Sequence, residues 1–296
     1  MIYLSHFGLR EPPFGITPDT SFFYACSSSQ EALNTLLVAV ANGEGFIKIT
    51  GEVGTGKTLL CRKFLATLDD NWVSAYVPNP NLEPRTLLLA LAEEMRVKLD
   101  GGLDQHHLLK ALNLALLDFA RQKRRVVVCL DETQAMPLES LETLRLLTNL
   151  ETEKRKLVQV ILFGQPELDD RLAHGSIRQL RQRITFQHHM GTLTRGETEH
   201  YLAHRLAIAG FSGDAVFAPA AVKAIYRASR GVPRLINILA NKAMMLAYGE
   251  GVRKVTGRHA RSATADTPAS FALSRAWLWL AIACAAFSSI GWMILR

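Results

Sequence analysis

The pattern GxxxxGK[ST], which runs from Gly51 to Thr58, constrains this chain more than any other feature. An apolar run over residues 46–50 precedes it and predicts a strand, and residues 59–68 predict a helix, which is the context that the pattern requires. The glycines let the backbone curl so that its N–H groups point inward at phosphate oxygens, and the helix start adds a partial positive charge. The sequence therefore predicts a strand–loop–helix unit that holds a nucleotide by its phosphates.

The residues expected to contact this nucleotide are Gly51, Glu52, Val53, Gly54, Thr55, Gly56, Lys57, Thr58 and Leu59. The Lys57 ammonium should reach the β- and γ-phosphates, and the Thr58 hydroxyl should ligate Mg²⁺. A second apolar run over residues 126–130 predicts a strand buried on both faces, and it ends at Asp131 and Glu132. Because open α/β sheets place ligands at the carboxyl ends of their strands, we expect Asp131 to hold Mg²⁺, either directly or through an intervening ligand, and Glu132 to polarise the attacking water. The predicted cofactors are ATP and Mg²⁺.

Expected strands and helices alternate as far as residue 190, which indicates a parallel sheet built from βαβ units. From Thr194 the pattern becomes purely helical, and three segments over residues 195–249 each end at glycine. The predicted parts are a lead-in packed on the nucleotide domain (1–25), an α/β nucleotide-binding domain (26–190), a small all-helical domain (191–250), a basic flexible tether (251–275) and a transmembrane helix (276–295).

The last predicted part, residues 276–295, contains no charged side chain and carries tryptophans near both ends. Twenty helical residues at about 1.5 Å each span roughly 30 Å, the thickness of a bilayer core. Three arginines lie shortly before the segment and one follows it, so the positive-inside rule keeps the long N-terminal part in the cytoplasm. We therefore expect a single C-terminal membrane span with the nucleotide domain on the cytoplasmic side.

The net charge of +7 is unevenly distributed along the chain. Residues 251–296 hold six Lys and Arg residues and one acid, which leaves 28 basic and 26 acidic side chains over residues 1–250. The predicted globular part is therefore close to neutral, which argues against nucleic acid as a partner. The four cysteines show no CxxC spacing, and Cys61 and Cys129, which fall in an expected apolar helix and strand, are expected to be small core residues in a reducing compartment.

Several motifs follow the phosphate loop in a characteristic order. They are the acidic strand, Gln165 after the next strand, an arginine-bearing segment over residues 178–184, and Gly231-Val232-Pro233-Arg234. This order resembles that of AAA+ ATPases, which implies an α/β P-loop sheet followed by a helical lid. Further stretches at 3–14, 17–19, 31–33, 144–151 and 164–168 make residues 1–250 similar to the general secretion pathway protein A family. Its members include the ATPase of mannose-sensitive haemagglutinin pilus biogenesis, a type IV pilus.

The resemblance implies roles for three further residues. Gln165 matches a sensor position that would hold the attacking water or a γ-phosphate oxygen, and Arg234 matches a second sensor on the lid. Arg183 is the favoured arginine finger, with Arg181 as the alternative. Such a finger enters a neighbouring subunit's site, so the resemblance implies a homo-oligomeric ring.

The function implied by the resemblance is that of a membrane-anchored, Mg²⁺-dependent AAA+ ATPase in the bacterial inner membrane. It would power or regulate assembly of a pilus or type II secretion apparatus, with the proteins of that apparatus as partners. The family often carries a peptidoglycan-binding domain beyond the membrane helix, whereas this sequence stops at Arg296, so direct cell-wall contact is not expected. Two alternatives stay open: an ATP-dependent DNA-binding AAA+ protein of the transposition-regulator type, and a scaffold that binds ATP without hydrolysing it.

Overall fold

The computed structural model describes residues 2–99, 102–149, 151–152 and 155–268, and these fall into two units. The nucleotide unit runs from Pro18 to Gly191, and the helical unit combines the chain up to Thr17 with the chain from Thr192 onward. The predicted boundary between the α/β and helical parts lies at residue 190, and the two units divide after Gly191.

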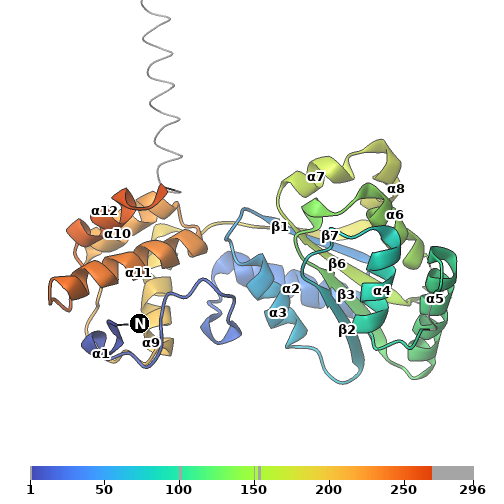
Figure 1. The fold of residues 1–296 in the computed structure, drawn as a ribbon, viewed down its shortest axis with the longest axis horizontal. Helices are drawn as coiled ribbons and strands as arrows, with labels where there is room; N and C mark the ends of the chain where they lie inside the picture. The colour runs from blue at the N-terminus through green and yellow to red at the C-terminus, as the bar shows by residue number, and fades with distance from the viewer. Residues whose placement is uncertain (1, 100–101, 150, 153–154, 269–296) are drawn as a thin grey trace, which may run out of the picture. The chain divides into compact units, whose positions relative to one another are not determined.

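The nucleotide unit is built on a parallel sheet with the strand order β2-β3-β6-β1-β7 (Figure 1). Its strands are β1 (Phe46–Gly51), β2 (Trp72–Val77), β3 (Arg125–Leu130), β6 (Val158–Gly164) and β7 (Ile184–Met190). Two short strands, β4 (Glu151–Thr152) and β5 (Arg155–Lys156), pair antiparallel outside this sheet. Because β1, β3 and β6 are neighbours and parallel, the residues that follow their carboxyl ends meet at one edge.

Helices cover both faces of this sheet. Alternate residues of β1 divide between them: Ile47 and Ile49 pack with α2 (Ser27–Asn42) and α3 (Lys57–Leu65), whereas Phe46 packs on the opposite face. The opposite face carries α4 (Pro84–Glu94), α5 (Gln105–Arg121), α6 (Leu138–Leu147), α7 (Glu167–Leu172) and α8 (Arg178–Gln182). Short 3₁₀ turns complete the unit: η1 (Thr20–Phe22), η2 (Thr133–Ala135) and η3 (Gly175–Ile177). The predicted α/β P-loop fold is confirmed.

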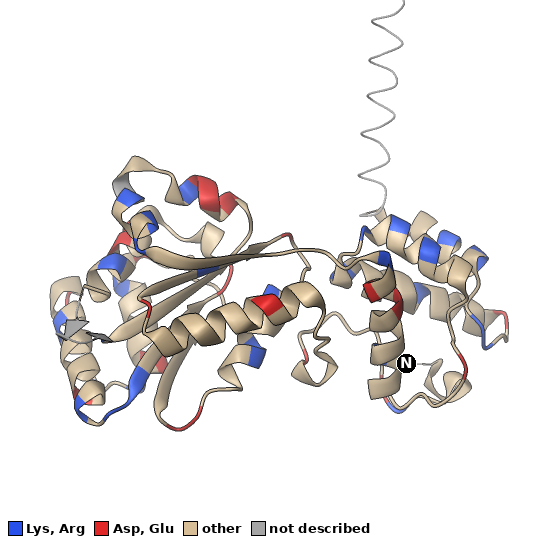
Figure 2. Ribbon diagram, turned by 180° about the vertical axis from the view of Figure 1, so that it is seen from behind, with Lys and Arg blue, Asp and Glu red and all other residues tan. Residues whose placement is uncertain are grey.

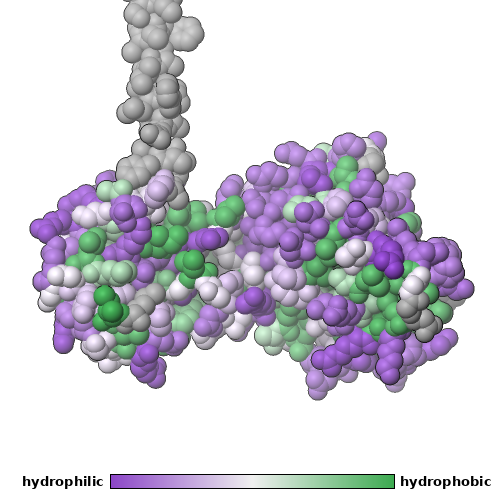
Figure 3. Space-filling model, viewed as in Figure 1, coloured by the Kyte–Doolittle hydropathy of each residue, from purple (hydrophilic) through white to green (hydrophobic). Residues whose placement is uncertain are grey.

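The helical unit consists of α1 (Leu4–Phe7), α9 (Arg195–Ile208), α10 (Pro219–Ser229), α11 (Pro233–Gly249) and α12 (Gly257–Ala265). The predicted capping box at the start of α9 is present, because Thr194 and Glu197 each bond the backbone of the other. Exposed hydrophobic residues of this unit include Ile2, Met245, Leu246 and Val252. Figure 3 shows hydrophobic residues, in green, among the polar residues on the surface of this unit.

The predicted flexible tether is wrong over residues 257–265, which form α12. The helix packs on α10 and α11, and it buries Ala260, Ala263 and His259. The N–H of Val255 donates to the Val216 carbonyl at 2.8 Å just before the helix. The segment is rich in Arg, Ser, Thr and Ala, a composition that is typical of a linker. Its small residues nevertheless lie on one face of α12, where they permit close packing against neighbouring helices. The helical part therefore extends from 192 to 268 among the described residues, past the predicted end at 250.

The lead-in is ordered as predicted, but its first part packs on the helical unit and not on the nucleotide unit. The Tyr3 hydroxyl donates to Asn241 Oδ1 at 2.5 Å, and the Asn237 amide donates to the Gly15 carbonyl at 3.1 Å. Arg205 also donates to the backbone of this segment. The reason is apolar burial, because the aromatic rings of residues 3, 7 and 14 are all buried there. Residues 18–25 belong to the nucleotide unit, as predicted.

None of the helices within residues 2–268 that the structure describes combines the length and the apolar character needed to cross a bilayer. The predicted transmembrane helix, residues 276–295, lies outside the described residues, as does the part of the predicted tether beyond residue 268.

Candidate nucleotide-binding and hydrolysis site

The loop between β1 and α3 has a backbone that demands glycine at several positions. Gly54 and Gly56 have φ angles of +84° and +101°, which side chains rarely tolerate. A Cβ atom on Gly51 would lie 2.9 Å from both the Met190 carbonyl oxygen and Thr55 Oγ1. By contrast, a Cβ on Gly56 would meet no atom within 4 Å, so the space beside this glycine is open. The spacing of the motif therefore produces a tight turn with open space next to Gly56.

The donors facing this space come from the start of α3. The first i→i−4 bond of the helix joins the Leu60 N–H to the Gly56 carbonyl at 2.9 Å. The N–H groups of Lys57, Thr58 and Leu59 precede that bond and are available to phosphate oxygens. This arrangement of glycine cradle and helix N-terminus fits a nucleotide polyphosphate.

Lys57 supplies the positive charge of the loop. Its side chain is buried, and its ammonium donates to the carbonyls of Gly51 at 2.7 Å and Glu52 at 3.1 Å. Burial lowers the pKa of Lys57, and the nearby carboxylates of Glu132 and Asp131 partly offset that shift. The ammonium therefore bonds the phosphate loop and lies close enough to the acidic pair for the charges of its carboxylates to act on it.

Asp131 is joined directly to the loop. Thr58 Oγ1 donates to Asp131 Oδ2 at 2.5 Å, and the Glu132 N–H donates to Asp131 Oδ1 at 3.0 Å. Burial raises the pKa of Asp131, while these two hydrogen bonds act in the opposite direction. A hydroxyl and a carboxylate in contact provide the hard oxygen ligands that Mg²⁺ prefers, so these residues fit the predicted metal.

Glu132 has an unusual backbone and a well-defined carboxylate. Its φ is +53°, a left-handed conformation that costs about 1–3 kcal/mol for a residue other than glycine and that clusters at functional sites. Its Oε2 atom accepts from Gln134 Nε2 at 2.6 Å and from Gln165 Nε2 at 3.1 Å. The Gln165 N–H in turn donates to Gln134 Oε1 at 3.0 Å. Glu132, Gln134 and Gln165 therefore form a closed triangle of hydrogen bonds, which we call the glutamine clamp.

Gln134 is the residue of this clamp that the sequence analysis missed. It lies in η2, whose turn is fixed by a bond from Thr133 Oγ1 to the Phe163 carbonyl at 2.9 Å. The sequence did offer one signal for Gln134: its side-chain amide, the same group that Gln165 carries, stands two residues after Glu132. The structure also brings Gln165 to Glu132 from the end of β6, where its position in the sequence placed it.

Arg234 lies in the helical unit, exposed on the first turn of α11. The glycine of its motif is required, because Gly231 has a φ of +77° and a Cβ there would lie 1.9 Å from the Leu193 carbonyl oxygen. The Leu193 N–H donates to the Gly231 carbonyl at 2.9 Å. The motif thus sets how α11 begins relative to the segment that precedes α9.

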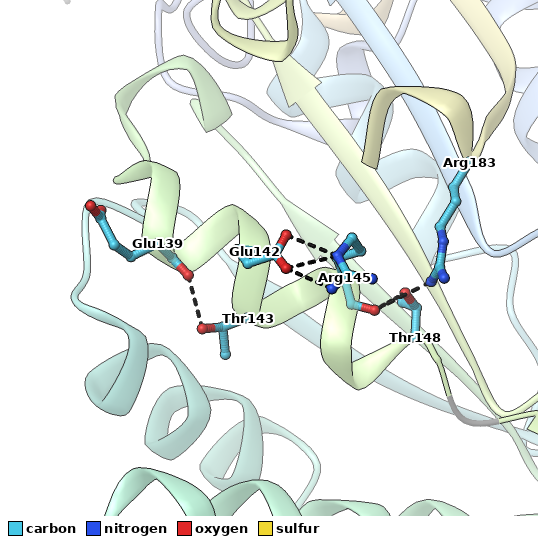
Figure 4. A network of polar contacts seen from close by, with 6 residues as sticks. All are labelled: Glu139, Glu142, Thr143, Arg145, Thr148 and Arg183. Atoms are coloured by element: carbon cyan, nitrogen blue, oxygen red, sulfur yellow. Dashed lines mark hydrogen bonds and ion pairs between the residues drawn. The ribbon is translucent and has the colours of Figure 1, made fainter. Parts of the chain in front are cut away.

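Arg183 caps the C-terminus of α8 and is partly buried (Figure 4). Its Nη1 donates to the Arg145 carbonyl at 3.4 Å, and the Arg145 side chain pairs with Glu142 at 2.6 Å. Arg181, two residues earlier, is exposed. The structure thus ties Arg183 to α6 of its own subunit and leaves Arg181 at the surface.

Comparison with known proteins identifies relatives of both units. Residues 40–172 match the family described as an AAA domain. The chain is 40% identical over 254 residues to general secretion pathway protein A of Aeromonas hydrophila, an alignment that covers 86% of this chain and 46% of that protein. The chain therefore spans about half the length of this relative.

Two solved structures share the fold at low sequence identity. The Aeropyrum pernix ORC2 protein superimposes with a TM-score of 0.62 at 19% identity, over 84% of this chain and 72% of that one. The Thermotoga maritima RuvB Holliday junction branch migration motor superimposes with a TM-score of 0.55 at 17% identity, over 84% of this chain and 72% of that one.

Proposed function

We propose that this chain, as an AAA+ ATPase related to general secretion pathway protein A, hydrolyses MgATP at the bacterial inner membrane. This hydrolysis would power or regulate assembly of a secretion or pilus apparatus. The observation that carries the proposal is the convergence of the phosphate loop, the Thr58–Asp131 contact and the glutamine clamp at one sheet edge. The secretion role rests on the name of the Aeromonas relative.

The chemistry assigns one task to each side chain. The Lys57 ammonium and the loop N–H groups bind phosphate oxygens, and Thr58 with Asp131 holds Mg²⁺, which when bound neutralises charge on those oxygens. The Glu132 carboxylate orients the attacking water and accepts its proton. Gln134 and Gln165 fix that carboxylate in place, so that no reorientation is needed when the water attacks.

Two arginines are proposed to act beyond this cluster. Arg234 would contact the γ-phosphate from the helical unit, so that hydrolysis changes the contacts of that unit. Either Arg183 or Arg181 would serve a neighbouring subunit in a homo-oligomer. Arg181 is exposed, so its side chain is accessible to a neighbouring subunit, whereas Arg183 bonds α6 of its own subunit. An Arg181→Ala protein that loses activity only when assembled would favour Arg181, and the same loss in Arg183→Ala would favour Arg183.

The secretion role is tested by replacing the chromosomal gene with a Glu132→Gln variant. We expect this variant to bind ATP, to hydrolyse it poorly, and to abolish pilus display or exoprotein secretion in the cell. Glu139→Gln is the matched control, because it makes the same change at an exposed position on α6. Normal pili and normal secretion in the Glu132→Gln strain would reject the assembly role while leaving the ATPase assignment intact.

A further inference from the structure

The positive charge of this protein is concentrated on the last helices of the helical unit. Residues 218–268 contain nine Lys and Arg residues and only two acids. Both acids are already engaged: Glu250 pairs with Arg258 at 2.5 Å and with His259 at 3.0 Å, and Asp266 pairs with Lys242 at 2.8 Å. The charge balance of the globular part was expected to be near neutral, but it is strongly positive over residues 218–268. Part of this excess comes from α12, which belongs to the folded helical unit and not to a tether.

A groove of about 500 Å³ lies between α10 and α12. Three exposed cations, Lys223, Arg227 and Arg261, line it, and its floor is made of small residues: Ala220, Ala224, Ala228 and Thr264. We call this surface the cationic face. Figure 2 shows lysine and arginine positions gathered on the helices of this unit. The small floor leaves the three charges as the groups that reach furthest outward.

The charges of the cationic face gain no ion pair from the described part of the chain. Lys223 and Arg227 are four residues apart on α10, a spacing at which like charges repel and destabilise a helix. Within residues 2–268 as described, no carboxylate pairs with Lys223, Arg227 or Arg261. An uncompensated cluster of this kind indicates an anionic partner outside the chain.

We propose that the cationic face docks on the anionic phospholipid surface of the membrane. Proximity favours this occupant, because α12 ends at Ala265 and the uncharged apolar run of residues 276–295 begins about ten residues later. Ten residues reach at most roughly 35 Å, so a membrane that holds this run lies within reach of α12. Basic residues next to a membrane segment bind acidic headgroups at short range. The proposal rests on the proposed function at the inner membrane and on the membrane span that the sequence predicts over residues 276–295.

The test uses the full chain in lipid nanodiscs of phosphatidylcholine, with and without phosphatidylglycerol, and follows amide hydrogen exchange of α10 and α12 peptides. We expect exchange in these peptides to slow when phosphatidylglycerol is present, and the effect to disappear at high salt. A Lys223→Gln/Arg227→Gln/Arg261→Gln variant should lose this protection. Each cation near an anionic membrane contributes about 1 kcal/mol, which is roughly a fivefold change in the ratio of docked to undocked protein. The triple change should therefore lower this ratio about 100-fold.

The matched control is Lys98→Gln/Lys110→Gln/Arg121→Gln, which removes three exposed charges from the nucleotide unit and should keep the protection. Equal exchange rates in both kinds of nanodisc would overturn the proposal. Protection of the same peptides by duplex DNA at physiological salt, without protection by phosphatidylglycerol, would also overturn it in favour of nucleic acid. Co-elution with neutral nanodiscs tests the anchor separately. If the chain does not co-elute with neutral nanodiscs, salt-sensitive co-elution with anionic nanodiscs still supports docking of the cationic face. Absence of co-elution with anionic nanodiscs as well would reject that docking.

Discussion

Replacing Gln134 with alanine should slow ATP hydrolysis without weakening ATP binding. The side chain contacts Glu132 Oε2 at 2.6 Å and accepts from the Gln165 N–H at 3.0 Å. A hydrogen bond to a charged group contributes about 1.5–3 kcal/mol. If about half of this free energy is expressed in the transition state, kcat falls by a factor of about 4 to 13, because about 1.4 kcal/mol corresponds to a factor of ten.

The assay measures kcat by phosphate release at saturating MgATP and the Kd for a non-hydrolysable ATP analogue on the same preparation. Gln122→Ala is the matched control, since Gln122 donates to the Asp118 carboxylate at 2.7 Å on the exposed surface of the same unit. We expect the control to match the parent protein in both quantities. A Gln134→Ala protein with unchanged kcat, or with a weakened Kd and normal kcat, would refute the role given to the glutamine clamp.

Three further outcomes follow from the geometry. Gly231→Ala should destabilise the helical unit by about 3 kcal/mol in thermal unfolding, from left-handed strain and a broken backbone bond, whereas Gly249→Ala, with open space around its Cβ, should be neutral. Arg205→Ala should expose residues 2–17 to limited proteolysis, because this buried guanidinium holds their carbonyls; an unchanged cleavage pattern would contradict this. Burial raises the pKa of Asp131, so as pH is lowered the affinity for MgATP should begin to fall at a pH above the usual carboxyl range. Without Mg²⁺, the protonated Asp131 stabilises the fold at pH values below the raised pKa, and this stabilisation is lost as pH rises through it.

The features that could be predicted from sequence are those fixed by local spacing and by burial on both faces. The run that became β3 is apolar throughout and ends in two acids, so its place in the middle of a parallel sheet followed directly. The phosphate loop was equally determined, since glycines at 54 and 56 are the residues that adopt its positive φ angles. These two elements position Thr58 against Asp131 with no further information.

The features that were missed depend on contacts between distant segments. Gln134 contacts Glu132 and Gln165 only because η2 turns back toward the end of β6, and no local pattern in the sequence indicates that turn. The composition of residues 251–275 is typical of a linker, yet Ala260 and Ala263 are buried against neighbouring helices. The aromatic residues before Thr17 indicated an ordered segment, but not which unit would bury them.

The most direct test of the account is calorimetric titration of ATP and Mg²⁺ into the parent protein, Lys57→Ala and Glu132→Gln, with phosphate release measured in parallel. We predict that the parent protein binds and hydrolyses MgATP, that Lys57→Ala binds far more weakly, and that Glu132→Gln binds normally but turns over slowly. A parent protein that gives no heat with MgATP, or a Lys57→Ala protein that binds it as well as the parent does, would contradict the assignment of residues 51–59 as the phosphate cradle.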